Sequence, residues 1–323
     1  MAYLWPDDIL IAIESGQLSP LEAFKKLRAM DQSVNCRQDS ANGQPNLEER
    51  IENILRELDN LVGLAEVKKL VREIYAFIEI QKRRERERLN TEPLVLHMIF
   101  KGNPGTGKTT VARILGRVFR EMGVLSRGHL IEVERADLVG EYIGHTAQKT
   151  REQLKKAYGG ILFIDEAYSL ARGGEKDFGK EAIDCMVKAM EDHKDELILI
   201  LAGYQKEMES FLQTNPGLRS RFPIHIDFPD YNKQELLQIA EQLCMKRQYQ
   251  LNTQTKLVLL NSLNPPEANS DDNFGNARTV RNIIEKAIRR QAVRLIAKHS
   301  TTREELMVLE PCDLTGVDKC ANV

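Results

Sequence analysis

The sequence carries almost no net charge. Its 323 residues include 46 Lys and Arg against 48 Asp and Glu, for a formal net charge of −2. A protein whose main task is to coat nucleic acid or an anionic membrane needs an excess of basic residues. We therefore expect neither nucleic acid nor a membrane among its partners.

Long apolar runs are also missing. The longest, Leu197 to Ala202, is far shorter than the 18 or more residues that a membrane span requires. The N-terminus lacks a basic region, and Asp7 and Asp8 interrupt its apolar stretch, so we expect no signal peptide. These features predict a cytoplasmic protein that is not inserted into a membrane.

The cysteines and histidines show no pattern typical of a metal site. The 5 cysteines are scattered without a C-x-x-C pair, and the 6 histidines have no ligand spacing. We interpret the cysteines as reduced thiols, in agreement with a cytoplasmic location.

Short apolar runs alternate with helical patterns through the middle of the chain. Runs of this length, nearly continuous in apolar residues, are typical of a parallel sheet covered by helices on both faces. The sequence therefore predicts an α/β domain with a parallel five-stranded sheet, its strands at Leu94–Lys101, Leu130–Val133, Ile161–Ile164, Leu197–Ala202 and Ile224–Phe228.

Helical patterns flank this region. They run from Leu47 to Leu58 and from Ala65 to about Leu89 before the first strand. After Pro229 we expect strands to stop, with helices over Lys233–Arg247, Thr253–Leu263 and Asn276–Lys298. The predicted division is a helical N-terminal extension (1–30), a linker (31–46), an α/β domain (47–229), a helical domain (230–315) and a tail (316–323).

A phosphate-binding motif follows the first predicted strand. Residues Gly102 to Thr109 read GNPGTGKT and match G-x-x-x-x-G-K-[ST]. Glycines let such a loop wrap a phosphate chain, while the lysine reaches the β- and γ-phosphates and the hydroxyl of Thr109 coordinates Mg²⁺. We expect nucleotide contacts at Asn103, Pro104, Gly105, Thr106, Gly107, Lys108, Thr109 and Thr110.

A second motif, Asp165-Glu166, ends the apolar run Ile161–Ile164. Asp165 is placed to hold the Mg²⁺ shell, and Glu166 to orient or deprotonate the attacking water. No Asn/Thr-Lys-x-Asp guanine motif is present, which favours ATP as the nucleotide and Mg²⁺ as its metal.

Together these motifs resemble the AAA+ ATPase plan of a P-loop NTPase core followed by a C-terminal α-helical lid. Further segments are similar to the subgroup of red-type Rubisco activases and stage V sporulation protein K, with residues 159–179 especially close to the latter. The resemblance covers residues 47 to 315 and leaves out the first thirty. It is carried by Leu61–Leu64, Leu138–Thr146, Leu201–Tyr204 and Asn215–Arg221.

The resemblance implies roles for individual residues. Val62 and Gly63 would line the adenine pocket, and Arg278 would touch the phosphates from the lid as the second sensor. Arg221, with Arg219 as the other candidate, would be the arginine finger that reaches the γ-phosphate of the neighbouring subunit. Such a finger would make hydrolysis depend on assembly.

The resemblance also implies a homo-oligomeric ring, expected to be a hexamer. Tyr142, Ile143 and Gly144 fit the aromatic-hydrophobic-glycine loop that grips a polypeptide in the central pore of such rings. The sequence departs from the family where most members carry Asn, Thr or Ser at the end of the fourth strand. Tyr204 follows that strand here, and it could replace them through its hydroxyl.

Several functions remain open at this point. The leading hypothesis is an ATP-driven motor that remodels a protein substrate, with a role in bacterial sporulation. Activation of red-type Rubisco is the alternative within the same family. An ATP-controlled binding module, with N-terminal helices that dock a partner, belongs to a different class. A DNA motor is disfavoured by the near-zero net charge.

Overall fold

The computed structural model describes residues 46–91, 95–142, 144–172, 178–263, 275–298 and 300–315. The chain divides into two units, residues 1–53 and residues 54–323, and the account below concerns the second. Helix α3 (Leu47–Asp59) begins in the first unit and ends in the second. The predicted N-terminal helices, linker and tail lie outside the described residues, apart from Asn46.

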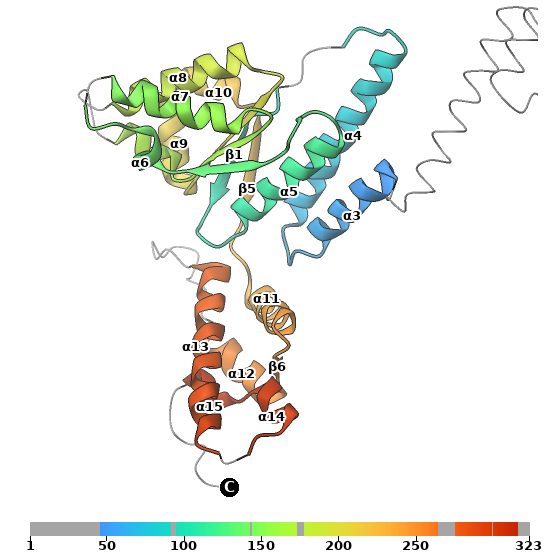
Figure 1. Ribbon diagram of the computed structural model, residues 1–323, viewed down its shortest axis with the longest axis vertical. Coiled ribbons are helices and arrows are strands. Elements are labelled where there is room, and N and C mark those ends of the chain that lie inside the picture. Colours follow the sequence, from blue (N-terminus) through green and yellow to red (C-terminus); the bar gives the residue numbers. More distant parts are fainter. Residues whose placement is uncertain are drawn as a thin grey trace, which may run out of the picture. The chain divides into compact units, whose positions relative to one another are not determined.

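A parallel sheet of five strands lies between helices in the α/β part of the second unit (Figure 1). Its order is β2-β3-β4-β1-β5, and every neighbouring pair is parallel. Because the strands are parallel, their carboxyl ends meet at one edge, where α/β proteins bind ligands. The strands are β1 (Met98–Gly102), β2 (Leu130–Val133), β3 (Gly160–Ile164), β4 (Leu197–Gly203) and β5 (Ile224–Phe228).

The first strand begins at Met98 rather than at the predicted Leu94. In the register of β1 with β4, Met98 lies opposite Ile200, so Leu199 would face residue 97. The N–H of Leu199 instead donates to Nδ1 of the buried His97 side chain at 3.0 Å. The His97 side chain therefore accepts the hydrogen bond from the Leu199 N–H that backbone pairing would need if β1 began earlier.

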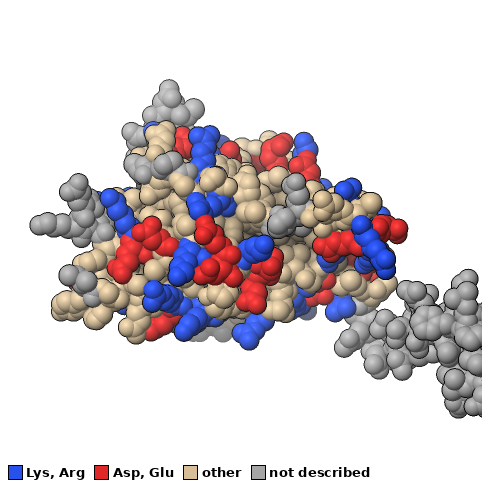
Figure 2. Space-filling model, turned by 90° about the horizontal axis from the view of Figure 1, so that it is seen from above, with Lys and Arg blue, Asp and Glu red and all other residues tan. Residues whose placement is uncertain are grey.

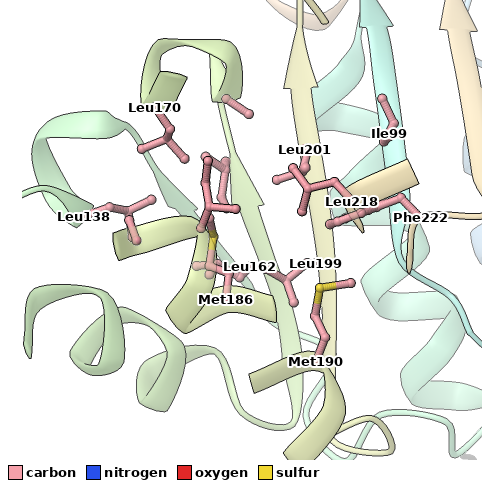
Figure 3. Packing of buried hydrophobic residues seen from close by; sticks show 14 of the residues in the cluster. Ile99, Leu138, Leu162, Leu170, Met186, Met190, Leu199, Leu201, Leu218 and Phe222 are labelled. Carbon is pink, nitrogen blue, oxygen red and sulfur yellow. The ribbon is translucent and has the colours of Figure 1, made fainter. Parts of the chain in front are cut away.

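One face of the sheet packs against helices α7 (His145–Ala157), α8 (Gly179–Asp192), α9 (Gln205–Thr214) and α10 (Pro216–Arg221). Alternate strand residues such as Leu162, Leu199 and Leu201 point into this layer, as Figure 3 shows. The short helices α6 (Arg135–Leu138) and η1 (Ala167–Ala171) complete the layer with Leu138 and Leu170.

The opposite face carries helix α5 (Lys108–Glu121), which contacts β2 and β3. Phe100 and Phe163 on this face meet edge to face with ring centroids 6.3 Å apart. Helix α4 (Ala65–Arg86) contacts the edge strand β5. Apolar burial on both faces explains why the strands read as continuous apolar runs.

A helical region, which we call the lid, follows the connector Pro229–Asn232. It contains α11 (Lys233–Lys246), α12 (Thr253–Ser262), α13 (Asn276–Ile296), α14 (Arg303–Met307) and α15 (Pro311–Thr315). The expectation that strands stop after Pro229 is wrong, since β6 (Gln250–Leu251) pairs with β7 (Val308–Leu309). Strands of two residues are too short to leave an alternating pattern in the sequence.

The cysteines differ from the sequence interpretation at one position. Cys312 in α15 is in a disulfide, whereas Cys185 and Cys244 are free. Burial raises the pKa of Cys244 to about 11, which keeps this thiol protonated and inert. Separately, among the described helices none combines the length and the apolar character needed to cross a membrane.

Candidate active site

A cleft of about 980 Å³ opens at the carboxyl edge of the sheet, between the core and the lid. It brings together most of the predicted site residues: Val62, Pro104, Gly105, Gly107, Lys108, Thr109, Thr110, Asp165, Glu166 and Arg278. The predicted residues Gly63, Asn103 and Thr106 do not line it, although each is adjacent in sequence to residues that do. The arrangement joins residues as far apart in the sequence as Val62 and Arg278.

The phosphate loop, Asn103–Gly107, connects β1 to α5. Gly105 and Gly107 have φ angles of 74° and 101°, which side-chain-bearing residues rarely adopt. A Cβ on Gly105 would also lie 2.3 Å from the carbonyl oxygen of Gly275. Because Gly107 directly precedes α5, the loop aims its backbone N–H groups and the positive end of the helix at the cleft.

Lys108 lies at the first turn of α5. Its Nζ donates to the carbonyl oxygens of Gly102 and Asn103, each at 2.8 Å. Burial lowers the pKa of this lysine, Asp165 opposes that effect, and the charge of Arg278 adds to it. The two cations and the carboxylate therefore share one end of the cleft, as a phosphate-binding site requires.

Hydrogen bonds from the hydroxyls of Thr106 and Tyr231 hold the phosphate loop in place. Thr106 is fully buried, and its hydroxyl donates to the carbonyl oxygen of Asn103 at 2.8 Å. The Tyr231 hydroxyl donates to the carbonyl oxygen of Thr106 at 3.0 Å. Burial raises the pKa of Tyr231 to about 12, so this hydroxyl stays protonated as a donor. Tyr231 was missed in the sequence because its partner lies 125 residues away.

Asp165 and Glu166 follow β3 at the edge of the sheet. Asp165 is anchored through its N–H to the carbonyl oxygen of Val133 at 3.0 Å, and its Oδ1 accepts from the N–H of Glu166 at 3.0 Å. Glu166 has φ 47° and ψ 43°, a left-handed conformation that is unfavourable for a residue with a long side chain. Such strain is typical of functional positions, and here it turns the exposed Glu166 toward the cleft that it lines.

Thr109 and Asp165 are the residues suited to hold Mg²⁺, since both present oxygen atoms, which this ion prefers. Thr109 donates from its hydroxyl to Oε1 of Glu132 at 3.3 Å. The carboxylate of Glu132 in β2 was not predicted from the sequence. It places a second carboxylate, besides that of Asp165, next to the predicted metal ligand Thr109.

Tyr204, which follows β4, lines the same cleft. Its ring lies 5.9 Å from that of Tyr168, over which the Arg172 guanidinium sits at 4.6 Å. Burial and the nearby Glu166 carboxylate raise the pKa of Tyr204. Tyr204 is therefore a neutral hydroxyl close to the residue predicted to act on water.

The other end of the cleft is apolar. Val62 is buried there, and further apolar side chains come from Leu61, Leu64, Ile239 and Leu243. Gly63 has φ 62°, and a Cβ on it would lie 2.5 Å from Oε1 of Glu235. Lys68 fixes this segment by donating from Nζ to the carbonyl oxygens of Leu61 at 2.5 Å and Asp59 at 3.0 Å. Such an apolar pocket suits the ring of a nucleotide base.

The two arginine-finger candidates lie outside this cleft, on α10. Arg221 donates to Oε1 of Glu191 at 2.6 Å and to the carbonyl oxygen of Gly217 at 2.9 Å. Arg219 is exposed on the same helix. Both side chains are thus unable to serve the cleft of their own chain as this structure arranges them.

The predicted pore-loop residues lie between α6 and α7. Tyr142 is 67 % exposed, and its ring meets that of His145 edge to face at 5.5 Å. Gly144 has φ 82° and directly precedes α7. Ile143 lies outside the described residues.

Charges of both signs are interspersed on the surface. On the face shown in Figure 2, basic and acidic side chains alternate without one sign dominating. This mixture is consistent with the near-zero net charge of the sequence, which alone does not fix how the charges are distributed. It gives that face no extended field of one sign.

Comparisons with known families agree with this geometry. The profile of the ATPase family associated with various cellular activities (AAA) matches residues 98–230, and that of the AAA lid domain matches residues 232–321. A crystal structure of the FIGL-1 AAA domain in complex with ADP has a TM-score of 0.54 at 17 % identity, over 80 % of this chain and 82 % of that one. At that identity the likeness shows the fold alone.

Curated relatives are more similar in sequence. Stage V sporulation protein K of Bacillus subtilis is 56 % identical over 82 % of this chain and 83 % of its own length. Protein CbbX of Cereibacter sphaeroides is 46 % identical over 76 % of this chain and 80 % of its own. The chloroplastic ribulose bisphosphate carboxylase/oxygenase activase of Cyanidioschyzon merolae is 42 % identical over 87 % of this chain and 97 % of its own length.

Proposed function

Because the chain belongs to the AAA+ ATPases, in the group of stage V sporulation protein K and the red-type Rubisco activases, we propose that it hydrolyses ATP to remodel a protein. The reaction converts ATP and water into ADP and phosphate. We further propose that residues 47–229 form the nucleotide-binding domain and residues 230–315 its lid.

The observation that carries the proposal is the convergence of Lys108, Asp165, Glu166 and Arg278 on one cleft. Lys108 binds the β- and γ-phosphates, together with the backbone N–H groups of the phosphate loop. Arg278 binds them from the lid. Glu166 orients the attacking water and takes its proton, while these cations stabilise the charge that develops on the phosphoryl oxygens.

Thr109 and Asp165 would hold Mg²⁺, which would supply charge neutralisation on the phosphates of the nucleotide. Val62 and Gly63 accommodate adenine at the apolar end of the cleft. Glycine is favoured at position 63 because its φ of 62° lies in a region that residues with side chains rarely adopt.

We propose that the active assembly is a homo-oligomeric ring, a hexamer by analogy with the family. The position of Arg221 on α10, outside its own cleft, supports a role on the phosphates of a neighbouring subunit. To reach a neighbour, Arg221 must leave Glu191. Arg219 is the second candidate for the same role, and comparing the two single substitutions separates them.

The polypeptide substrate would contact Tyr142, Ile143 and Gly144. The high exposure of Tyr142 supports this proposal, since a buried tyrosine could not grip a passing chain. The test is Tyr142→Ala, which should abolish remodelling of a protein substrate while basal ATP turnover continues. Unchanged remodelling would show that the loop does not pull.

The function as a whole is tested by measuring oligomeric state and phosphate release together. Wild type, Glu166→Gln and Arg221→Ala are compared with and without ATP. We expect Glu166→Gln to trap an ATP-dependent ring, and Arg221→Ala to bind ATP without hydrolysing it. A monomer in which Arg221→Ala hydrolyses ATP at the wild-type rate would contradict the shared site.

We propose a biological role in sporulation, which the 56 % identity to stage V sporulation protein K supports. Complementation of a sporulation-defective strain that lacks this relative tests it directly. Activation of red-type Rubisco is the competing role, supported by identities of 42 % and 46 %. ATP turnover that rises with inhibited Rubisco, together with failed complementation, would reverse this preference.

An ATP-controlled binding module is the second candidate function. It is favoured by Tyr204, which stands where most of the family carries a smaller polar residue. This function requires slow hydrolysis that no polypeptide stimulates, and loss of partner binding when residues 1–40 are deleted. Stimulation of turnover by an unfolded polypeptide would exclude it.

A further inference from the structure

Asn276, the first residue of α13, lies two positions before Arg278 and is fully buried. Its φ of 44° falls in the left-handed region. Asparagine tolerates this region better than most residues, but the conformation still needs support from its surroundings. The support comes from the side chain of Asn276 itself.

That side chain joins the lid to two other parts of the chain. Its Oδ1 accepts from the N–H of Tyr231 at 3.0 Å, and its Nδ2 donates to Oδ1 of Asp230 at 2.7 Å. A longer contact of 3.4 Å runs from Nδ2 to the carbonyl oxygen of Pro104. Asp230 in turn accepts from Nδ2 of Asn103 at 3.1 and 2.9 Å. One buried amide thus links the lid, the connector and the phosphate loop.

The backbone near Asn276 lies directly on the phosphate loop. The N–H of Ala277 donates to the carbonyl oxygen of Gly105 at 3.2 Å. A Cβ on Gly105 would lie 2.8 Å from the nitrogen of Arg278. The first turn of α13 is therefore fixed against the loop that binds phosphate, and Arg278 leaves this turn into the cleft.

A second buried amide on the same helix shows a different pattern. Gln291, 3 % exposed, donates from Nε2 to the carbonyl oxygens of Glu305, Leu306 and Val308. All three acceptors belong to the lid. The side-chain hydrogen bonds of Gln291 stay within the lid, whereas those of Asn276 reach the connector and the phosphate loop.

We propose that Asn276 is the positioning residue for Arg278: its bonds to Asp230, Tyr231 and Pro104 set the lid so that the Arg278 guanidinium faces the phosphates. This inference rests on the proposed role of Arg278. Asn276 itself is not among the residues that line the cleft. Its contribution passes through the orientation of the first turn of α13.

The test is the substitution Asn276→Gly, which keeps the positive φ accessible and removes the amide. We expect the KM for ATP to rise about tenfold, toward the value of Arg278→Ala. If Asn276 acts through Arg278, adding Asn276→Gly to Arg278→Ala raises the KM no further. Independent, multiplicative effects of the two substitutions would overturn the proposal.

Gln291→Ala is the matched control, since it removes a buried amide from the same helix. It should lower the melting temperature while the KM for ATP stays within about twofold of wild type. An equal rise in KM for Gln291→Ala would mean that lid stability alone controls the affinity. That result would also overturn the positioning role.

An exchange of partners tests the bond to Asp230, and replaces the glycine variant if that protein does not fold. Asn276→Asp places two carboxylates together and should raise the KM at least tenfold. Adding Asp230→Asn restores a donor and an acceptor, and should return the KM to within about threefold of wild type. A double variant no better than Asn276→Asp contradicts the proposal.

Different results would contradict the proposed role of Arg278 and the proposed role of Asn276. If Arg278→Ala leaves the KM for ATP unchanged while Glu166→Gln abolishes turnover, the role of Arg278 fails and this inference with it. If Arg278→Ala raises the KM and Asn276→Gly does not, only the positioning role is wrong.

Discussion

The two ends of helix α13 bury polar groups in different ways. At its N-terminal end, Asn276 bonds to residues 45, 46 and 172 positions away in the sequence. Toward its C-terminal end, Arg294 donates from Nε and Nη2 to Asp313 at 3.0 and 2.9 Å, only 19 positions away. Glu310 accepts from the same guanidinium at 2.9 Å.

The difference separates two uses of buried polarity. Arg294 and Asp313 satisfy each other inside the lid, and their side chains are 17 % and 2 % exposed. Contacts of this kind stabilise one region. The contacts of Asn276 join the lid to the connector and the phosphate loop, which are distant from it in the sequence. Contacts of that kind orient a site.

The largest expected effect comes from a reactive group in the cleft. Glu166→Gln removes the carboxylate that we propose as the base, so we expect steady-state phosphate release to fall at least about 100-fold. ATP binding and the free energy of unfolding should change little, because the side chain is exposed. The control is Glu209→Gln on α9. Equal losses in both variants would show that the effect is not specific to the cleft.

The lid end of α13 should respond in stability instead. Asp313→Ala leaves Arg294 partly buried without its main partner, which should cost about 3 kcal/mol of unfolding free energy. Urea unfolding measures the loss. The KM for ATP at a temperature where the variant is folded should equal that of wild type. A change in KM with no loss of stability would reverse the comparison between the two ends.

A buried histidine in the core, unlike the groups at the two ends of α13, should make the stability of the protein depend on pH. Burial lowers the pKa of His97 from 6.5 to about 4. Between these values the unfolded chain binds a proton that the folded chain does not, so stability falls as the pH drops from 6.5 to 4. The loss reaches about 3 kcal/mol at the lower pH.

Unfolding in urea at several pH values measures this slope. His97→Asn is the matched control, because its Oδ1 can accept from the N–H of Leu199 and does not titrate. The control should lose the contribution of His97 to the slope between pH 6.5 and pH 4. An unchanged slope would mean that other groups cause it.

The smallest effect on the unfolding free energy is expected at an exposed ion pair that lies outside helix α13. Arg221 and Glu191 are 2.6 Å apart, with side chains 36 % and 61 % exposed. Because solvent screens such pairs, Glu191→Ala should change the unfolding free energy by less than about 1 kcal/mol. A loss as large as that of Asp313→Ala would contradict this ranking of buried and exposed pairs.

The contiguous motifs were predictable because their chemistry is local. A loop of glycines before a lysine and threonine, or an Asp-Glu pair after an apolar run, needs only neighbours in the chain to take its shape. The same holds for the strands β2, β3, β4 and β5, whose apolar runs mark them to within one residue. The start of β1 was misplaced because the His97 side chain, a tertiary partner of β4, ends the ladder there.

Tertiary structure alone decided the supporting contacts. Tyr231 under the phosphate loop, Asn276 between lid and connector, and Glu132 beside Thr109 have partners that no local pattern indicates. The paired strands β6 and β7 could not be predicted from the sequence either, because two residues are too few to show an alternating apolar pattern.

The sequence by itself therefore determined the fold class, the nucleotide-binding motifs and the family of this protein. Those depend on apolar periodicity and on residues that are adjacent along the chain. Only the tertiary structure decided which distant side chains hold the motifs in place. Hydrogen bonds have a short range in space, and the chain must fold before residues such as Pro104 and Asn276 come within it.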